Sequence, residues 1–220
     1  MSQQFLNKME KDYIKNIGEK CERRFYQSEL RAPDKESRTV EGYAAVFNSD
    51  SEIMWGSWVE RIAPGAFSEV LKDNAVALFN HDPNLILARN GVTMTITEDA
   101  KGLKYRFEAP NTTAGNDLLE NLRNGNVNQS SFAFTVKEED WQESTERSKP
   151  SVRTIKKVER LYDVSPVTYP AYPDTSVGQR SFQGWKKEAE EVQKKETEKQ
   201  EARDLLSDMK RKHEIFELSL

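Results

Sequence analysis

Between residues 23 and 167 the chain repeatedly alternates apolar and polar side chains. A period of two residues is typical of β-strands that are buried on one face only. In the segment NVNQSSFAFTVK, Phe132 and Phe134 fall on one face, and Ser131 and Thr135 fall on the other. The alternating segments TMTITED and GLKYRFEA flank a turn and predict a hairpin. This region is therefore predicted to consist mostly of strands.

Two short helices are predicted between these strands, in APGAFSEVLK and TTAGNDLLENLRNG, where apolar residues recur at helical spacing. RRFYQSELRA and RTVEGYAAVFN predict two strands joined by a turn around PDKES. The polar residues 138–150 predict a surface loop. The predicted fold class is α+β: a mostly antiparallel β-barrel or strongly curved sheet with a few short helices and a charged C-terminal helical tail.

The two ends of the chain differ in character from its middle. Residues 186–213 contain nine Lys or Arg and eight Asp or Glu residues, a density of charge that cannot be buried. Residues 186–220 are therefore predicted to be a charged helical or disordered tail. Apolar residues at helical spacing up to Gly18 predict an N-terminal amphipathic helical extension over residues 1–21. The folded domain is predicted to span residues 22–185.

Composition argues against several classes of function. The formal net charge of -4 gives no reason to expect nucleic acid or an anionic membrane as partner. No apolar run approaches the ~20 residues that cross a bilayer, and the N-terminus lacks the apolar core of a signal peptide. Cys21 is the only cysteine, so no intramolecular disulfide can form and a cytoplasmic setting is expected.

His81 is the only histidine in the predicted folded domain, because His213 lies in the tail. As a metal ligand it would need several further His or acidic ligands, and the sequence contains no such cluster. It could instead support a turn, although Asp82-Pro83 can form a turn without it. A third role is general base for a serine nucleophile, which also requires an acid to orient the imidazole ring.

Candidates for the serine and the acid lie at the ends of predicted strands. Ser131 shares its face with the small residues Ala133 and Thr135, so a substrate could approach it. Ser130 points to the face that carries the phenylalanines and is the weaker candidate. Asp163, in RLYDVSPVTYPAY, ends another predicted strand. Serines are common on strands, so the residues alone leave a structural and a catalytic interpretation open.

Four segments, taken together and in order, resemble the prohead maturation proteases of tailed bacteriophages, which are relatives of the herpesvirus assemblins. The segments are ERIAPGAFSEVL, ALFNHDPNLILAR, NGNVNQSSFAF and LYDVSPVTYPAY, within residues 23–175. The resemblance implies a herpesvirus-protease-like barrel and a serine endopeptidase without a cofactor or metal ion. It assigns Ser131 as nucleophile, His81 as general base and Asp163 as the acid that orients the base.

Three positions depart from the usual pattern of that family. Ala88 and Ala133 stand where glycine is common, and Asp163 stands where glutamate is usual. Ala133 affects the expected geometry around the oxyanion, and the shorter aspartate requires the imidazole ring to lie closer. None of these changes removes a reactive atom, so an active enzyme is expected.

The resemblance also implies partners and a location. The expected substrates are the scaffolding region of the major capsid protein and the protease itself, cleaved inside the immature capsid, or prohead, in the host cytoplasm. The portal and a second copy of the chain, forming a homo-oligomer, are further candidate partners, whereas nucleic acid and membrane are not expected. The alternative is a non-enzymatic scaffold or assembly protein that works through the charged tail. Such a protein would have no need of His81 or Ser131.

Overall fold

The computed structural model describes residues 21–26, 30, 37–146, 149–169 and 176–217. The chain forms two compact units, Met1–Val177 and Gly178–Leu220. The predicted N-terminal helix lies outside the described residues. The predicted division of the chain at residues 21 and 185 stays a prediction.

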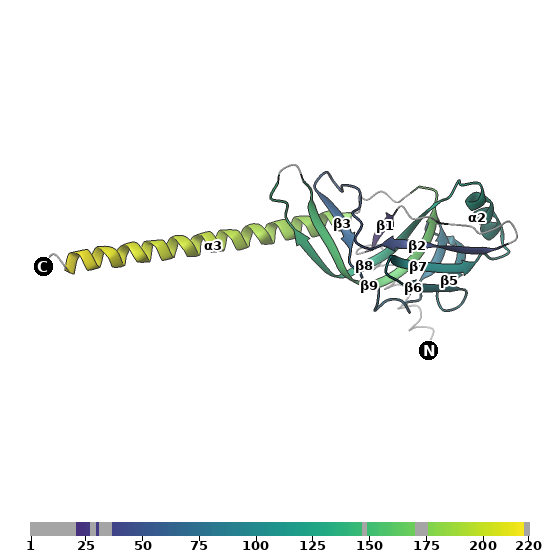
Figure 1. The fold of residues 1–220 in the computed structure, drawn as a ribbon, viewed down its shortest axis with the longest axis horizontal. Coiled ribbons are helices and arrows are strands. Elements are labelled where there is room, and N and C mark those ends of the chain that lie inside the picture. Colours follow the sequence, from purple (N-terminus) through teal and green to yellow (C-terminus); the bar gives the residue numbers. More distant parts are fainter. Residues whose placement is uncertain (1–20, 27–29, 31–36, 147–148, 170–175, 218–220) are drawn as a thin grey trace. The chain divides into compact units, whose positions relative to one another are not determined.

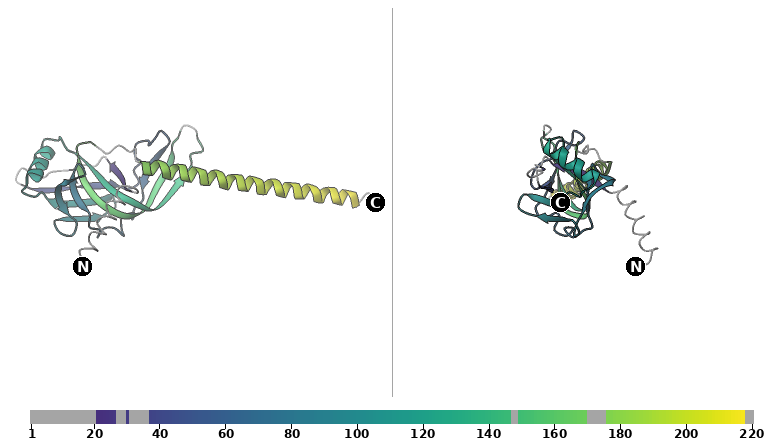
Figure 2. Two further views of the ribbon diagram at one scale, coloured as in Figure 1. Left: turned by 180° about the vertical axis from the view of Figure 1, so that it is seen from behind. Right: turned by 90° about the vertical axis from the view of Figure 1, so that its right-hand side faces the viewer.

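The described part of the first unit contains nine strands and the helix α2 (Thr113–Arg123). The strands are β1 (Glu22–Tyr26), β2 (Thr39–Val46), β3 (Trp58–Ile62), β4 (Val76–Phe79), β5 (Asp82–Arg89), β6 (Met94–Glu98), β7 (Gly102–Glu108), β8 (Gln129–Gln142) and β9 (Ser151–Val167). Figure 1 and Figure 2 show β8 and β9 as long, strongly curved neighbours. The mixed α+β class predicted from the sequence is therefore confirmed.

The strands pair as two sheets. Six strands form one sheet in the order β1-β8-β9-β4-β5, with β3 also paired to β9, and three strands form the other in the order β2-β7-β6. Both β3 and β4 run parallel to β9, whereas the other pairs are antiparallel. The pairing of the described strands branches at β9, because the first part of β9 pairs with β3 and the last part with β4. No pairing among these described strands closes a barrel.

The apolar faces of the two sheets contribute to one hydrophobic core. Phe132 and Phe134 of β8 stack with a ring-centroid distance of 4.7 Å, and Phe67 meets Phe132 edge-on at 5.7 Å. Tyr105 and Phe107 of β7 add a second stacked pair from the three-stranded sheet. Because these residues alternate along their strands, the same alternation directs their neighbours, including Ser131, to the opposite face of β8.

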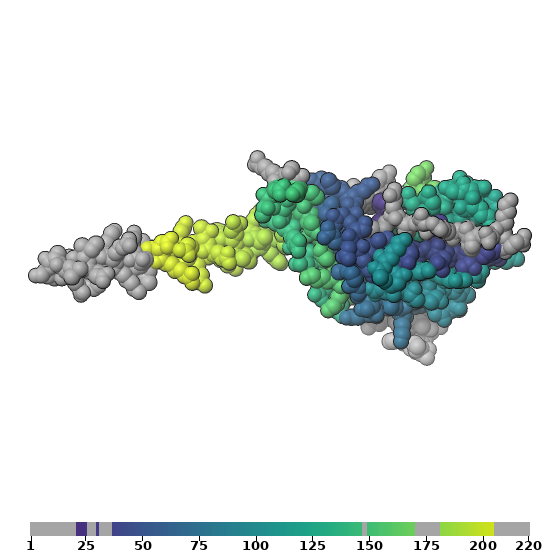
Figure 3. All heavy atoms as spheres, in the orientation of Figure 1, coloured from purple at the N-terminus to yellow at the C-terminus, as the bar shows by residue number. Residues whose placement is uncertain are grey.

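Helix α2 forms as the sequence predicted. Thr112 caps its first turn by accepting a hydrogen bond from the Gly115 amide, and Leu118, Leu119 and Leu122 are buried. The helix ends at Arg123 with Asn124 as its C-cap, and the next residue, Gly125, has a φ of 72°. Figure 3 shows α2, coloured teal, on the surface of this unit.

The helix predicted for APGAFSEVLK is not present. The segment after β3 forms consecutive turns joined by hydrogen bonds between residues three apart, such as Val70 N to Phe67 O at 2.9 Å. Gly65 has a φ of 84°, which an α-helix does not contain. Phe67 and Val70 are nevertheless buried. The helical spacing of the apolar residues thus identified the buried side chains but not the backbone that carries them.

Other local predictions have mixed outcomes. β6 and β7 form the predicted antiparallel hairpin, and the Asp99 side chain accepts hydrogen bonds from the amides of Lys101 and Gly102 in its turn. β1 and β2 are both strands, but β1 pairs with β8 and β2 with β7, so they belong to different sheets. The loop predicted from residue 138 begins only after β8 ends at Gln142.

A buried network of charged side chains joins four strands of the larger sheet. Arg24 Nε donates to Glu60 Oε1 at 2.7 Å, and Arg153 Nη1 donates to Glu22 Oε2 at 2.7 Å and to Glu60 Oε2 at 2.8 Å. Glu139 accepts from Arg153 Nε at 2.8 Å. Burial opposes ionisation of Glu22, but the two guanidinium groups outweigh it and hold the pKa of Glu22 below its ordinary value.

Replacing Arg153 with methionine is expected to lower the free energy of unfolding by ~3–5 kcal/mol, because Glu22 and Glu60 then remain buried with one guanidinium group fewer. Urea unfolding followed by circular dichroism measures the loss. As a control, Arg61→Met breaks an ion pair with Asp50 in which the side chains are 39% and 46% exposed. That variant should lose less than ~1 kcal/mol. Equal losses in the two variants would contradict the prediction.

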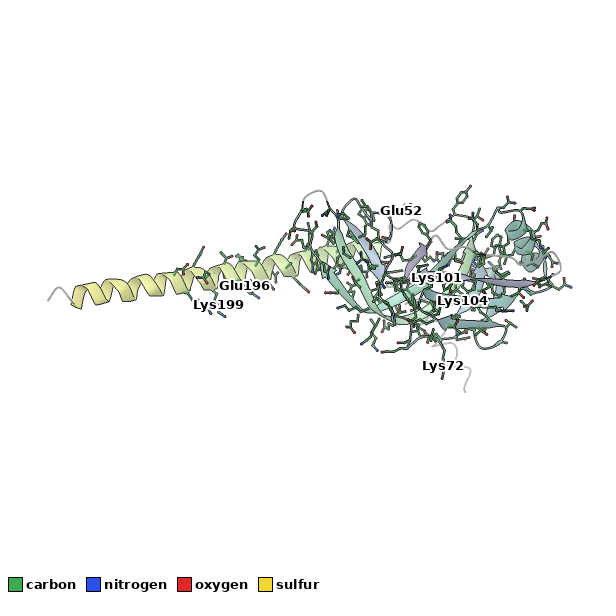
Figure 4. All side chains as sticks on the ribbon, in the orientation of Figure 1. Glu52, Lys72, Lys101, Lys104, Glu196 and Lys199 are labelled. Carbon is green, nitrogen blue, oxygen red and sulfur yellow. The ribbon has the colours of Figure 1, made fainter. Side chains whose placement is uncertain are left out.

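The second unit contains most of helix α3 (Ser176–Glu217), which begins before the charged segment predicted from residue 186. From residue 186 to residue 204 every side chain except Ala189 is exposed, and Figure 4 shows Glu196 and Lys199 projecting from the helix. Glu190 precedes Lys194 by four residues, a spacing that stabilises exposed helices. No helix among the described residues is long and apolar enough to span a membrane.

Candidate active site

Ser131 lies on the buried face of β8 that is directed away from the phenylalanines, and it is 0% exposed. The neighbouring Ser130 points into the core, where its Oγ shares a hydrogen bond of 2.5 Å with the Tyr105 hydroxyl. Burial raises the pKa of Tyr105, so this hydroxyl keeps its proton. The alternation of β8 therefore gives the two adjacent serines different surroundings.

His81 lies in the tight turn between β4 and β5. Both Asn80 and His81 have positive φ angles, 55° and 58°, a backbone conformation that asparagine and histidine adopt more often than most residues. The Asn80 side chain fastens this turn to the end of β9, because its Oδ1 accepts from the Thr168 amide at 2.8 Å. The Asn80 amide also donates to the Pro166 carbonyl oxygen at 3.0 Å. These contacts hold the backbone of the turn that carries the imidazole ring.

Asp163 lies near the end of β9, between β4 and β8. Its Cα pairs with Val76 on β4 and with Ala133 on β8. The residue is 6% exposed, and its Oδ1 accepts from Ser165 Oγ at 2.6 Å. Two residues further along β9, the Cα of Ser165 pairs with that of Ser131 on β8. Asp163 and Ser131 are therefore on neighbouring strands of one sheet, with His81 beside both.

The three side chains form a continuous chain of hydrogen bonds. The distance from His81 Nδ1 to Asp163 Oδ1 is 2.6 Å, and the distance from His81 Nε2 to Ser131 Oγ is 2.7 Å. An imidazole that donates its Nδ1 proton to Asp163 leaves Nε2 as an acceptor for the serine hydroxyl. This is the arrangement in which a histidine can remove a proton from a serine.

The Ser131 hydroxyl has a second contact, because Oγ also lies 3.0 Å from the carbonyl oxygen of Arg24 on β1. A hydroxyl carries one proton, which can be donated either to His81 Nε2 or to this carbonyl. Ser131 is fully buried, so both of these contacts are shielded from water.

The sequence around this site matches a known protein family. The family model described as caudovirus prohead serine protease matches residues 26–188, which is more than half of the chain and includes all three side chains. The chain belongs to the caudovirus prohead serine protease family. Among solved structures, the bacteriophage T4 capsid assembly protease is similar, with a TM-score of 0.41 and 13% sequence identity over 69% of this chain and 98% of that chain. No curated protein matches the chain.

In this prohead protease, Asp82 has a structural contact that separates it from Asp163. Although it follows His81 directly, its Oδ1 accepts from the Asn84 amide at 2.8 Å and from Asn84 Nδ2 at 2.9 Å. An aspartate that bonds to the amide two residues ahead stabilises a turn. The acid that contacts the imidazole ring is Asp163, which is distant from His81 in the sequence.

Three contributions to the site were not anticipated from the sequence of this protease. They are the hydrogen bond from Ser165 to Asp163, the Asn80 side chain that holds the histidine turn, and the Arg24 carbonyl beside the serine. A signal existed for Ser165, because residues two apart on a strand share a face and Ser165 follows Asp163 by two. The other two depend on contacts between segments distant in the sequence.

Cys21 directly precedes β1 and is partly buried. Burial raises the pKa of Cys21 to about 11, with a further contribution from Asp163. A thiol that keeps its proton is a poor nucleophile, so Cys21 is a poor candidate for that role. Among the residues that the structure describes, no group of three or more His, Cys, Asp and Glu side chains is placed to hold a metal ion.

Proposed function

We propose that this chain is the serine endopeptidase of a phage prohead, with Ser131 as nucleophile, His81 as general base and Asp163 as the acid that orients His81. The observation that carries the proposal is the pair of hydrogen bonds that His81 makes, 2.6 Å to Asp163 and 2.7 Å to Ser131. Membership of the prohead serine protease family supports the same assignment.

The proposed reaction begins when His81 Nε2 removes the hydroxyl proton of Ser131 and Oγ attacks a peptide carbonyl carbon. His81 then donates that proton to the leaving amine as the C–N bond breaks, which leaves an acyl-enzyme for water to hydrolyse. Asp163 stabilises the imidazolium that forms between these two steps. Hydrogen-bond donors to the tetrahedral oxyanion would each contribute on the order of 3 kcal/mol.

The proposed substrates are the scaffolding region of the major capsid protein and other copies of this protease, cleaved inside the prohead in the host cytoplasm. The kinship with herpesvirus assemblins that the four sequence segments suggested belongs to the same proposal. A scaffold protein without activity would have no use for a buried serine bonded to a histidine. The charged helix α3 is better accounted for as the part of the protease that binds the scaffold and carries the enzyme into the prohead.

Self-cleavage tests the proposed function without knowledge of the natural substrate. The purified chain is incubated, and its intact mass is followed by mass spectrometry beside that of Ser131→Ala. The proposal expects fragments from the first protein and none from the second. It also expects wild-type enzyme to cut added Ser131→Ala protein. If neither protein is shortened, alone or mixed, the proposed function is wrong.

The first cuts are expected in residues 186–220, so that the active protein loses part of its C-terminal ~35 residues. The physical reason is that the side chains of α3 described from residue 190 to residue 204 are exposed, so no buried contacts oppose local opening of the helix. Terminal fragments identified by mass give the position of each cut. First cuts confined to β8 or β9 would contradict this prediction.

A further inference from the structure

We propose that Ser165 is a positioning residue of this protease, which holds the Asp163 carboxylate in the orientation that His81 requires. This inference rests on the proposed function, because it concerns the rate of the same serine protease reaction. Ser165 is not assigned as catalytic. It acts on the reacting atoms only through Asp163 and His81.

The contact between the two residues is short and buried. Ser165 Oγ lies 2.6 Å from Asp163 Oδ1, with Ser165 0% and Asp163 6% exposed. Ionised aspartate has no proton to give, so the serine hydroxyl is the donor. The acceptor is the same oxygen that lies 2.6 Å from His81 Nδ1. One carboxylate oxygen is therefore held from two sides.

The position of Ser165 follows from the strand geometry. It stands two residues after Asp163 on β9, and residues two apart project from the same face of a strand. Its Cα is paired with that of Ser131 on β8. Ser165 therefore lies beside Asp163 on its own strand and beside Ser131 on the neighbouring strand. Its hydroxyl reaches Asp163 without any change in the backbone.

A second donor changes what Asp163 can do. The terminal torsion of an aspartate has a broad, roughly two-fold energy profile, so a carboxylate with one partner can rotate away from the imidazole. The Ser165 hydroxyl removes that freedom. It also gives a hydrogen bond to a carboxylate that burial has separated from water.

The test measures kcat and KM with Ser131→Ala protein as the substrate. Ser165→Ala is expected to lower kcat roughly 10- to 100-fold, because it removes a hydrogen bond to a charged group, and to change KM less than about twofold. Ser130→Ala is the matched control, since it also removes a buried hydroxyl with a hydrogen bond but lies on the other face of β8. Its kcat should stay within about threefold of wild type.

A double-mutant cycle separates positioning from a general loss of packing. In an Asp163→Asn background, Ser165→Ala should change kcat less than about twofold, because the carboxylate on which it acts is absent. If Ser165→Ala lowers kcat equally in the wild-type and the Asp163→Asn backgrounds, its role is structural and the inference is wrong. If Ser165→Ala does not fold, Ser165→Cys, which keeps the shape and a weak donor, is expected to show a smaller loss with the same coupling.

The two proposals can fail separately. Wild-type enzyme that never cuts the Ser131→Ala protein would overturn the proposed function and, with it, this inference. Wild-type enzyme that does cut it, together with Ser165→Ala at wild-type kcat, would overturn the role of Ser165 alone.

Discussion

Ser131→Ala is expected to lower the rate of self-cleavage and of capsid-protein cleavage by at least ~10⁴-fold, because no other atom at the site can form the acyl-enzyme. The fold should persist, since the change removes one oxygen from a strand residue whose backbone pairing is unaffected. The lost contacts are those to His81 Nε2 and the Arg24 carbonyl. Cleavage is measured by mass spectrometry, and folding by circular dichroism.

Ser130→Ala is the control at the adjacent position. Its activity should remain within about threefold of wild type, because its hydroxyl meets Tyr105 in the core rather than His81. Its stability should fall by ~1–3 kcal/mol, because the buried Tyr105 hydroxyl loses this partner. An inactive Ser130→Ala beside an active Ser131→Ala would exchange the roles of the two serines.

Asp163→Asn is expected to reduce kcat by about 10⁴-fold. The amide has nearly the shape of the carboxylate, but it carries no charge to stabilise the imidazolium. If its NH₂ group faces His81, it donates to Nδ1 and forces the ring proton onto Nε2, which then cannot accept from Ser131. The variant is compared with wild type in the same cleavage assay, and its unfolding is followed to show that it is folded.

Two further substitutions test whether Asp163 is the residue that orients His81. Asp82→Asn should retain activity, because Asp82 contacts Asn84 rather than the imidazole ring. Asp163→Glu should keep measurable activity, since it retains the charge and restores the side chain that the family resemblance leads one to expect. An Asp163→Asn enzyme with wild-type kcat would mean that a group other than Asp163 orients His81.

Properties that depend on neighbours a few residues apart could be predicted from the sequence. Alternation put Ser130 and Ser131 on opposite faces of β8, and the helical spacing of apolar residues located α2. The same reasoning failed after β3, where Gly65 at a φ of 84° belongs to a series of turns. A short run of apolar residues can be buried by turns as well as by a helix, so its spacing does not determine the backbone.

Strand pairing was decided only by the tertiary structure. A period of two residues tells which face of a strand is buried, but it does not name the neighbouring strand or the register. β9 pairs with β3, β4 and β8, and β1 and β2 lie in different sheets, which alternation could not show. The buried network around Arg153 could not be predicted for the same reason, because its charged side chains become neighbours only after four strands assemble.

The candidate site also combines residues that the sequence could identify with contacts that only the tertiary structure decided. Residue type and the four family-like segments were enough to choose Ser131, His81 and Asp163, but His81 is separated by 50 residues from Ser131 and by 82 from Asp163. The distances of 2.7 and 2.6 Å exist because β9 pairs with β8 on one side and with β4 on the other. Local sequence selects reactive groups, whereas the register of distant strands decides which of them can share a proton.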